Sequence, residues 1–384
     1  MSLSKLLTRS IIVGFSTLWL ATTALATVGV TDSEILIGSS LVLSGPTQDL
    51  GQGMKSGYEL VINKVNAAGG IHGRKIKLVV KDDKYEPLVS NENTKALINN
   101  DKVFSLFGYV GTPTTNASVP VINESKVPLL GMFTGAEIFR KPVNPLLFHV
   151  RASYYQETEK LVKHFTEDLK LKKIAVFIQQ DAYGNAGRDG VVAALQKRGL
   201  QLAAGGAYER NTMNIDVGYT AIKGAAPEAV VLVGAYKACA AFVKKAKADG
   251  LKARIANISF VGTSSLVAEM GADGDDTYVS QVMPNPWKSQ LQVVQDYRKD
   301  MEASGNKKLD YTSLEGYVSA LVLVESLKSA GKDLTRENFQ DAIRKVNTDI
   351  GGIKINFNGS QFAQDSVYLT KIKAGEVLDV DKME

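Results

Sequence analysis

The sequence has little of what catalysis or metal binding would require. It contains one cysteine, Cys239, and only three histidines, His72, His149 and His164, which lie far apart. Paired cysteines and a His-Glu-x-x-His segment are both absent, so we expect no bound metal. A Gly-x-Ser-x-Gly nucleophile elbow and a Gly-x-x-x-x-Gly-Lys-Ser/Thr phosphate loop are absent as well. We therefore expect neither enzymatic activity nor a cofactor.

One glycine-rich segment, 51–57, has a weak similarity to a dinucleotide site in which Asp82 would bind the ribose. Its spacing is Gly-x-Gly-x-x-x-Gly instead of Gly-x-Gly-x-x-Gly, and its glycines lie beyond the end of the preceding expected strand. We interpret these glycines as positions where a loop and a helix pack closely.

An apolar run at 11–20 follows Lys5 and Arg9 and precedes Ala24-Leu-Ala26, the pattern of a secretory signal. The run is short for a membrane span of about 20 residues, although an uncleaved anchor is the alternative. We expect cleavage near Ala26 and export of the remaining chain. No cysteine follows the run, so a lipid-modified N-terminus is not expected.

The charge balance argues against partners of strongly acidic character. Loss of residues 1–26 removes two of the 45 Lys and Arg residues and none of the 40 acidic ones, which lowers the net charge from +5 to +3. This value is too small to indicate nucleic acid or acidic lipid as a partner. Without a disulfide, the exported chain must be stabilised by its core alone, and it is long enough for two domains.

Strand-like and helix-like patterns alternate along the chain. The first cycle has expected strands at 35–42, 76–80, 103–107 and 127–130 and helices at 52–67, 92–99 and 114–124. The second has strands at 174–178, 200–208, 229–233 and 259–262 and helices at 156–169, 186–198, 217–224 and 237–248. Such near-continuous apolar strands predict parallel sheets with helices on both faces, and two cycles predict two such domains, with a break near 142–151. The later elements, a strand at 277–282 and helices at 287–303, 312–330 and 336–346, are too few for a third sheet and should return to the first two.

Small, hydroxyl-bearing or aromatic residues recur where these strands end, at the edge where open parallel sheets bind ligands. They lie at 44–46, 111–115, 132–134, 183, 236 and 263–264. The turn at 111–115 offers hydroxyls and free backbone N–H groups that suit a carboxylate, although a simple helix cap is the alternative. Six such groups from both cycles favour a cleft that closes on one small molecule.

Several segments carry a resemblance to a known family. They are Leu43-Ser-Gly-Pro46, 66–74, 76–82, 107–112, 127–131, Asp181-Ala-Tyr-Gly184 and 227–234. Over essentially the whole chain after residue 26, the sequence resembles the type I periplasmic binding proteins, specifically the leucine/isoleucine/valine-binding family of ABC-importer receptors.

The resemblance implies an α/β fold of two doubly wound parallel-sheet lobes joined by a three-strand hinge. The N-lobe would comprise 27–149 and 282–361, and the C-lobe 150–281 and 362–384. It implies a monomeric periplasmic receptor that captures an amino acid or a related organic acid by hinge closure and delivers it to ABC transporter permease subunits. A periplasmic sensor that reports such a ligand to a membrane receptor is the alternative.

The resemblance also implies the roles of seven residues. Thr112 would bind the ligand carboxylate. A backbone group at Met132, with the hydroxyl and N–H of Thr134, would contact the carboxylate and ammonium. Apolar burial would come from Leu50, Phe133 and Tyr236, with Tyr236 closing over the ligand and Tyr183 lining the cleft.

Two departures from the family pattern concern the ligand. Ser264 stands where branched-chain receptors carry a glutamate for the ligand ammonium, and Leu50 stands where an aromatic residue is common. A neutral serine cannot offset a buried ammonium. Aromatic and oxo acids are therefore candidates beside the amino acids, unless another acidic residue substitutes for the glutamate.

Overall fold

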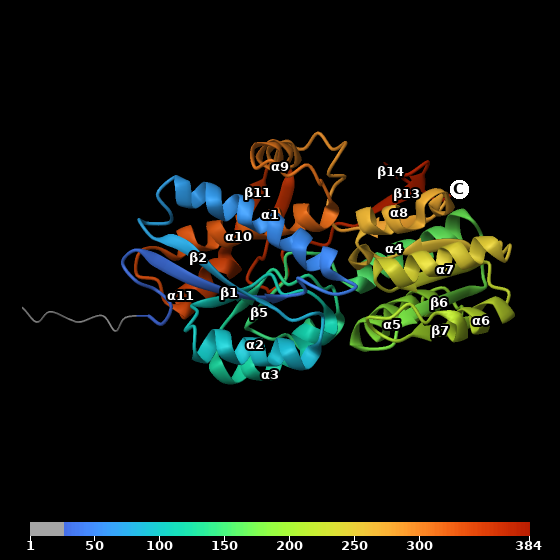
Figure 1. The fold of residues 1–384 in the computed structure, drawn as a ribbon, viewed down its shortest axis with the longest axis horizontal. Coiled ribbons are helices and arrows are strands. Elements are labelled where there is room, and N and C mark those ends of the chain that lie inside the picture. The colour runs from blue at the N-terminus through green and yellow to red at the C-terminus, as the bar shows by residue number, and fades with distance from the viewer. Residues whose placement is uncertain (1–26) are drawn as a thin grey trace, which may run out of the picture.

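The computed structural model describes residues 27–384. The expected signal and its cleavage point near Ala26 lie outside the described residues. Figure 1 shows two lobes side by side, each built from a sheet and flanking helices. Within 27–384, no helix combines the length and apolar character needed to pass through a bilayer.

The first lobe has a five-stranded parallel sheet. Its strand order is β2 (Lys75–Asp82), β1 (Glu34–Leu41), β3 (Ser105–Phe107), β4 (Leu129–Leu130) and β5 (Leu147–Phe148). The connecting helices are α1 (Gln48–Ala67), α2 (Pro87–Asn99) and α3 (Thr112–Ser125). In Figure 1, α2 and α3 lie together on one side of this sheet and α1 lies on the other.

The second lobe has a seven-stranded sheet. Its strand order is β14 (Glu376–Asp379), β13 (Tyr368–Lys373), β10 (Tyr278–Gln281), β9 (Arg254–Asn257), β8 (Ala229–Val233), β6 (Ile174–Gln179) and β7 (Ala204–Tyr208). The strands from β10 to β7 are parallel, whereas β13 and β14 form an antiparallel edge. β6 and β8 are buried along their whole length, as expected for apolar strands covered on both faces.

Five α-helices cover this sheet. They are α4 (Tyr154–Lys163), α5 (Ala182–Gln196), α6 (Asp216–Gly224), α7 (Tyr236–Ala248) and α8 (Thr263–Met270). α4 packs against α5, and α7 packs against α8. A π-helical turn, His164–Asp168, extends α4.

The late elements return to both lobes. The first lobe receives α9 (Gln292–Ala303), α10 (Tyr311–Ala330), α11 (Arg336–Lys345) and the small sheet of β11 (Asn347–Ile350) and β12 (Ile353–Asn356). α10 lies along α1, as Figure 1 shows, and is buried on almost every side. The second lobe receives β13 and β14.

Three segments cross between the lobes: β5 to α4, β10 to α9, and β12 to β13. The first and third run together, since His149 and Phe362 form a bridge. The doubly wound two-lobe architecture expected from the sequence is confirmed, with the antiparallel edge as an addition.

Some expected boundaries are wrong. Residues 259–262 are not a strand. The strand is β9, and Ser259–Val261 form a 3₁₀ turn, η3, directly after it. The apolar pair Phe260-Val261 resembles a strand in sequence because both side chains are buried. The strand expected at 200–208 begins only at Ala204. The helices expected from 52, 92 and 114 begin earlier, at Gln48, Pro87 and Thr112, and the helix expected from 287 begins at Gln292.

Candidate ligand-binding site between the lobes

Two threonine hydroxyls meet at the carboxyl ends of neighbouring strands. Thr112 opens α3 after β3, and Thr134 follows β4; both are fully buried, and their Oγ1 atoms lie 2.7 Å apart. Gly111 makes the turn possible because its φ is +99° and a Cβ there would lie 2.3 Å from the Tyr85 ring. The structure thus brings Thr112 and Thr134 into direct contact.

A third hydroxyl, that of Tyr154, lies near the hydroxyls of Thr112 and Thr134. Tyr154 is the first residue of α4, where Ser153 and Gln156 form a capping box, and it is fully buried. Burial raises the pKa of Tyr154 to about 12, while the charge of Arg151 and the hydroxyls of Thr134 and Thr112 act in the opposite direction. The sequence reasoning missed Tyr154, although the capping box marks its position at a helix start.

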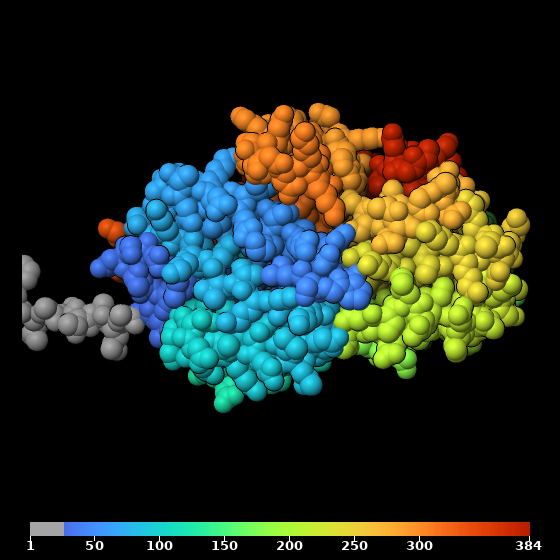
Figure 2. Space-filling view, in the orientation of Figure 1, coloured from blue at the N-terminus to red at the C-terminus, as the bar shows by residue number. Residues whose placement is uncertain are grey.

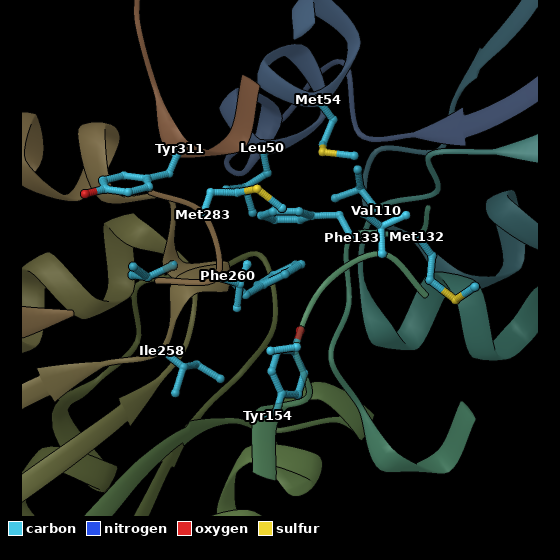
Figure 3. Close-up of a cluster of buried hydrophobic side chains, with 14 of the residues drawn as sticks. Leu50, Met54, Val110, Met132, Phe133, Tyr154, Ile258, Phe260, Met283 and Tyr311 are labelled. Carbon is cyan, nitrogen blue, oxygen red and sulfur yellow. The ribbon is translucent and has the colours of Figure 1, made fainter. Parts of the chain in front are cut away.

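Aromatic rings join the two lobes beside these hydroxyls. The ring of Phe260, on η3 of the second lobe, lies 5.1 Å from that of Phe133 and 6.1 Å from that of Tyr85, both in the first lobe. Tyr183 completes the group, with its ring 4.5 Å from Phe260 and 5.5 Å from Tyr154. Figure 3 shows the rings of Phe133 and Phe260 against one another. Phe260 was missed because its segment was interpreted as a strand.

Leu50 and Tyr236 meet at another point of the interface. A Cβ added to Gly262 would lie 2.6 Å from Leu50 Cδ2 and 3.6 Å from Tyr236 Cδ1, so α1, η3 and α7 are in close contact here. Both side chains are buried, at 1% and 3% exposure. Burial, and then the nearby charge of Asp49, raise the pKa of Tyr236 to about 12.

Ser264 contacts the first lobe through Asp310. It donates a hydrogen bond of 2.8 Å to Oδ1 of Asp310, the residue before α10, and so links the lobes directly. The N–H of Thr134 donates to the carbonyl of Met132 at 2.9 Å. The tight turn after β4 causes this internal bond.

A charged cluster lies behind Phe133. Arg151, in the first crossing segment, is fully buried, and its guanidinium carbon lies 4.9 Å from the Phe133 ring centre. Nη2 contacts Glu157 Oε1 at 3.1 Å and the hydroxyl of Ser259, and Nη1 lies 3.5 Å from Glu315 Oε1. Burial lowers the pKa of Arg151, but the two carboxylates outweigh it and raise the pKa overall. The sequence reasoning missed this cluster entirely.

Phe133, Met283, Tyr311 and Glu315 lie around a crevice between the lobes that has no room for a water molecule, so the lobes are closed against one another here. Figure 2 shows the lobes in contact without a wide opening between them. Among residues 27–384, no group of three or more His, Cys, Asp or Glu side chains is placed to hold a metal ion.

Known proteins are similar to this chain in sequence and in fold. The periplasmic binding protein family matches residues 34–376. A protein of Pseudomonas aeruginosa named amino acid binding protein is 26% identical over 306 residues, which cover 78% of this chain and 79% of that protein.

Two crystal structures are similar over their full length. A possible leucine/isoleucine/valine-binding protein from Rhodopirellula baltica has a TM-score of 0.86 and 28% identity, covering 92% of this chain and 98% of that chain. A substrate-binding periplasmic protein from Ralstonia solanacearum has a TM-score of 0.85 and 29% identity, covering 90% and 100% respectively. The chain therefore belongs to the periplasmic binding protein family, a family of solute-binding proteins.

Proposed function

We propose that this chain is the periplasmic receptor of an ABC importer and that it binds a small, largely apolar carboxylate between its lobes. The observation that carries the proposal is the buried hydroxyl pair of Thr112 and Thr134 beside an aromatic interface. Hydrogen bonds to a charged group contribute about 1.5–3 kcal/mol each. Three or four of them, together with apolar burial, are enough for a micromolar dissociation constant, about −8 kcal/mol.

Hinge closure would couple binding to transport. The proposed rigid units are 27–149 with 282–361 and 150–281 with 362–384, a division supported by the strand membership of the two sheets. A ligand that contacts both units binds the closed form more tightly and shifts the equilibrium towards it. The permease subunits would then recognise the closed monomer.

The names of relatives support an amino acid or a related organic acid as ligand. The Pseudomonas relative is named for amino acids, and the Rhodopirellula structure for leucine, isoleucine and valine. The decisive experiment is to denature protein purified from its native periplasm and identify released molecules by mass spectrometry, followed by a thermal-shift panel of amino, aromatic and oxo acids. N-terminal sequencing of the same preparation tests cleavage near Ala26. A preparation that releases no acid and is stabilised by none would contradict the proposal.

Substitution of Thr112 by valine should weaken binding of the identified acid at least tenfold, because a hydroxyl that donates to the carboxylate is lost. Isothermal titration calorimetry measures the change. Thr166→Val is the matched control, since this hydroxyl lies in the π-helical turn and donates to the Val162 carbonyl of α4, so its loss should leave affinity unchanged. Unchanged affinity in Thr112→Val would remove Thr112 from the site.

Substitution of Phe260 by alanine should favour an open arrangement, because this ring joins the lobes. We expect a loss of about 3–5 kcal/mol in stability and a larger radius of gyration by small-angle scattering. Phe242→Ala is the control: Phe242 packs on Phe177 and Tyr219 inside the second lobe, so its loss should destabilise without expansion. Equal radii for the two variants would argue against a role of Phe260 in closure.

A further inference from the structure

A cavity of about 760 Å³ lies where the first and third crossing segments run together. Its lining comes from residues 137–141 of the first lobe, from the start of α4 and from residues 362–366 of the third crossing segment. Small-molecule sites have volumes of roughly 300–1,000 Å³, so the space is sufficient for a ligand. It is lined by none of the residues expected to bind a ligand between the lobes, and we call it the hinge cavity.

Arg140 lines the hinge cavity and carries a charge that has no direct partner. It follows the 3₁₀ turn η1 (Glu137–Phe139) and is 5% exposed. Among residues 27–384, its guanidinium makes one hydrogen bond, from Nη2 to the Arg151 carbonyl at 2.8 Å, and no ion pair with a carboxylate. Nε is enclosed without an acceptor, whereas Nη1, which also lacks one, is not enclosed. Nη1 is therefore the donor available to an occupant of the cavity.

The charge of Arg140 is costly as it stands, because a buried cation needs a counter-ion. Burial lowers the pKa of Arg140 to about 10; the charge of Glu137 opposes this shift, and that of Arg151 adds to it. A purely structural role does not account for the charge. The guanidinium carbon lies 5.2 Å from the centre of the Phe362 ring, so Arg140 joins the first and third crossing segments, but a neutral glutamine could donate the same bond to a carbonyl.

The other charges around the hinge cavity leave it positive. Lys141 and Lys354 line it, and neither forms an ion pair within the described part of the chain. Lys197 and Glu159, which also line it, pair with one another at 3.2 Å. The remaining acids are Glu137 and Asp365. The first turn of α4 faces the cavity with Ser153 and Gln156, and the positive end of a helix dipole favours an anion.

We propose that the hinge cavity is a second binding site, which takes a small oxyanion, a carboxylate or a phosphate, on Nη1 of Arg140. Lys141 and Lys354 would surround the anion without the need for a direct bond. The anion would supply the counter-ion that Arg140 lacks, and the open volume lets it enter without a rearrangement of the core. This site is separate from the one proposed between the lobes and does not depend on it.

The test is calorimetric titration of the exported protein with inorganic phosphate, succinate and citrate, with the ionic strength held constant by sodium chloride. We expect at least one of these anions to bind. A response to phosphate alone identifies a phosphate site, and a response to succinate or citrate alone identifies a carboxylate site. Either response supports the proposal if it depends on Arg140.

Arg140→Met should weaken the bound anion at least tenfold, because it removes Nη1 and keeps apolar contact with Phe362. Arg336→Met is the matched control. Arg336 also donates to backbone carbonyls, those of Phe104 and Val103, both at 2.9 Å, but it does not line the hinge cavity, so its loss should leave the affinity unchanged. Thr112→Val should leave the affinity for the anion unchanged as well, although it weakens the acid that binds between the lobes.

A measurement on the unaltered protein does not depend on the folding of a variant. Acetylation of Lys141 and Lys354 with an N-hydroxysuccinimide ester, followed by peptide mass spectrometry, should slow at least threefold when the anion is present. Lys95, exposed on α2 and not part of the cavity lining, should react at the same rate with and without it.

Three results would overturn the inference: no binding of any of the three anions, equal affinity in Arg140→Met and the unaltered protein, or unchanged acetylation of Lys141 and Lys354. Loss of the anion in Thr112→Val instead of Arg140→Met would also overturn it, because the anion would then bind between the lobes. None of these results bears on the proposed function, which the thermal-shift panel tests separately.

Discussion

Replacement of Arg151 by methionine should lower the free energy of unfolding by about 3–5 kcal/mol at pH 8, because two buried carboxylates lose their cation. The side chains of Arg151 and Glu157 are 0% exposed, and that of Glu315 is 4% exposed. Methionine keeps apolar contact with the rings of Phe133 and Tyr154, on which the guanidinium now lies. The loss of unfolding free energy should therefore come mainly from the missing positive charge.

The loss of stability in Arg151→Met should depend on pH. Burial raises the folded-state pKa of Glu315 above its unfolded value, and loss of the opposing charge of Arg151 raises it further, so the folded state binds more protons. Stability is then regained as the pH falls from that raised value towards the ordinary glutamate value of 4.5. Urea unfolding at pH 5 and pH 8 measures the change, and Glu157→Gln with Glu315→Gln in the same variant should recover most of the loss at pH 8.

A surface arginine provides the control for this prediction. Arg188 pairs with Asp189 at 2.9 Å, and its side chain is 41% exposed. Arg188→Met should cost less than about 1 kcal/mol, because solvent screens exposed pairs. If Arg151→Met lost as little stability as this, or lost the same amount at both pH values, Arg151 would not be compensating buried carboxylates at the interface.

Replacement of Gly57 by alanine should be the other severe change. A Cβ at Gly57 would lie 1.8 Å from the Ser313 carbonyl oxygen, and one at Gly316 would lie 2.3 Å from that of Met54, so α1 and α10 touch through their backbones. Separating them costs about 1–3 kcal/mol or more, which exceeds the gain of up to about 1 kcal/mol from replacing a helical glycine. We expect a net loss of about 2 kcal/mol in urea unfolding.

Gly224→Ala is the matched control, because Gly224 ends α6 and a Cβ there meets nothing within 4 Å. It should be neutral or slightly stabilising. Gly57→Ala should also weaken ligand binding, since α1 carries Leu50, one of the expected site residues. A variant as stable as Gly224→Ala would show that the two helices separate without cost.

The repeated strand–helix order could be predicted because the central strands are continuous apolar runs, as in 229–233. The strands β5, β13 and β14 could not be predicted in this way. β5 has two residues, and β13 and β14 mix lysine and acidic side chains with apolar ones, since one face of an edge is solvated. Their place in the sheet follows from the strands they pair with, which a local pattern does not contain.

The hydroxyl pair was predictable from chemistry at two strand ends, but the charged cluster was not. Arg151 acquires its role from Ser259 and Glu315, which are remote in sequence. One signal was present in Glu315 itself: it lies in the N-terminal half of α10 among residues that are all buried, so its acidic side chain is a buried charge. Phe260 was not identified as an interface residue because its segment was expected to be a strand. A turn changes the direction of a side chain, and sequence periodicity does not show this.

The late elements of the chain also constrain the order of events during synthesis. The first lobe lacks α10 until residues beyond 311 have been made, and the second lacks an edge of its sheet until β13 is complete at Lys373. Neither lobe can therefore complete its core until the C-terminal part of the chain has been made. For a protein exported as we propose, this delay would keep the polypeptide loosely packed while it passes through a secretion channel, and would postpone compaction to the far side of the membrane.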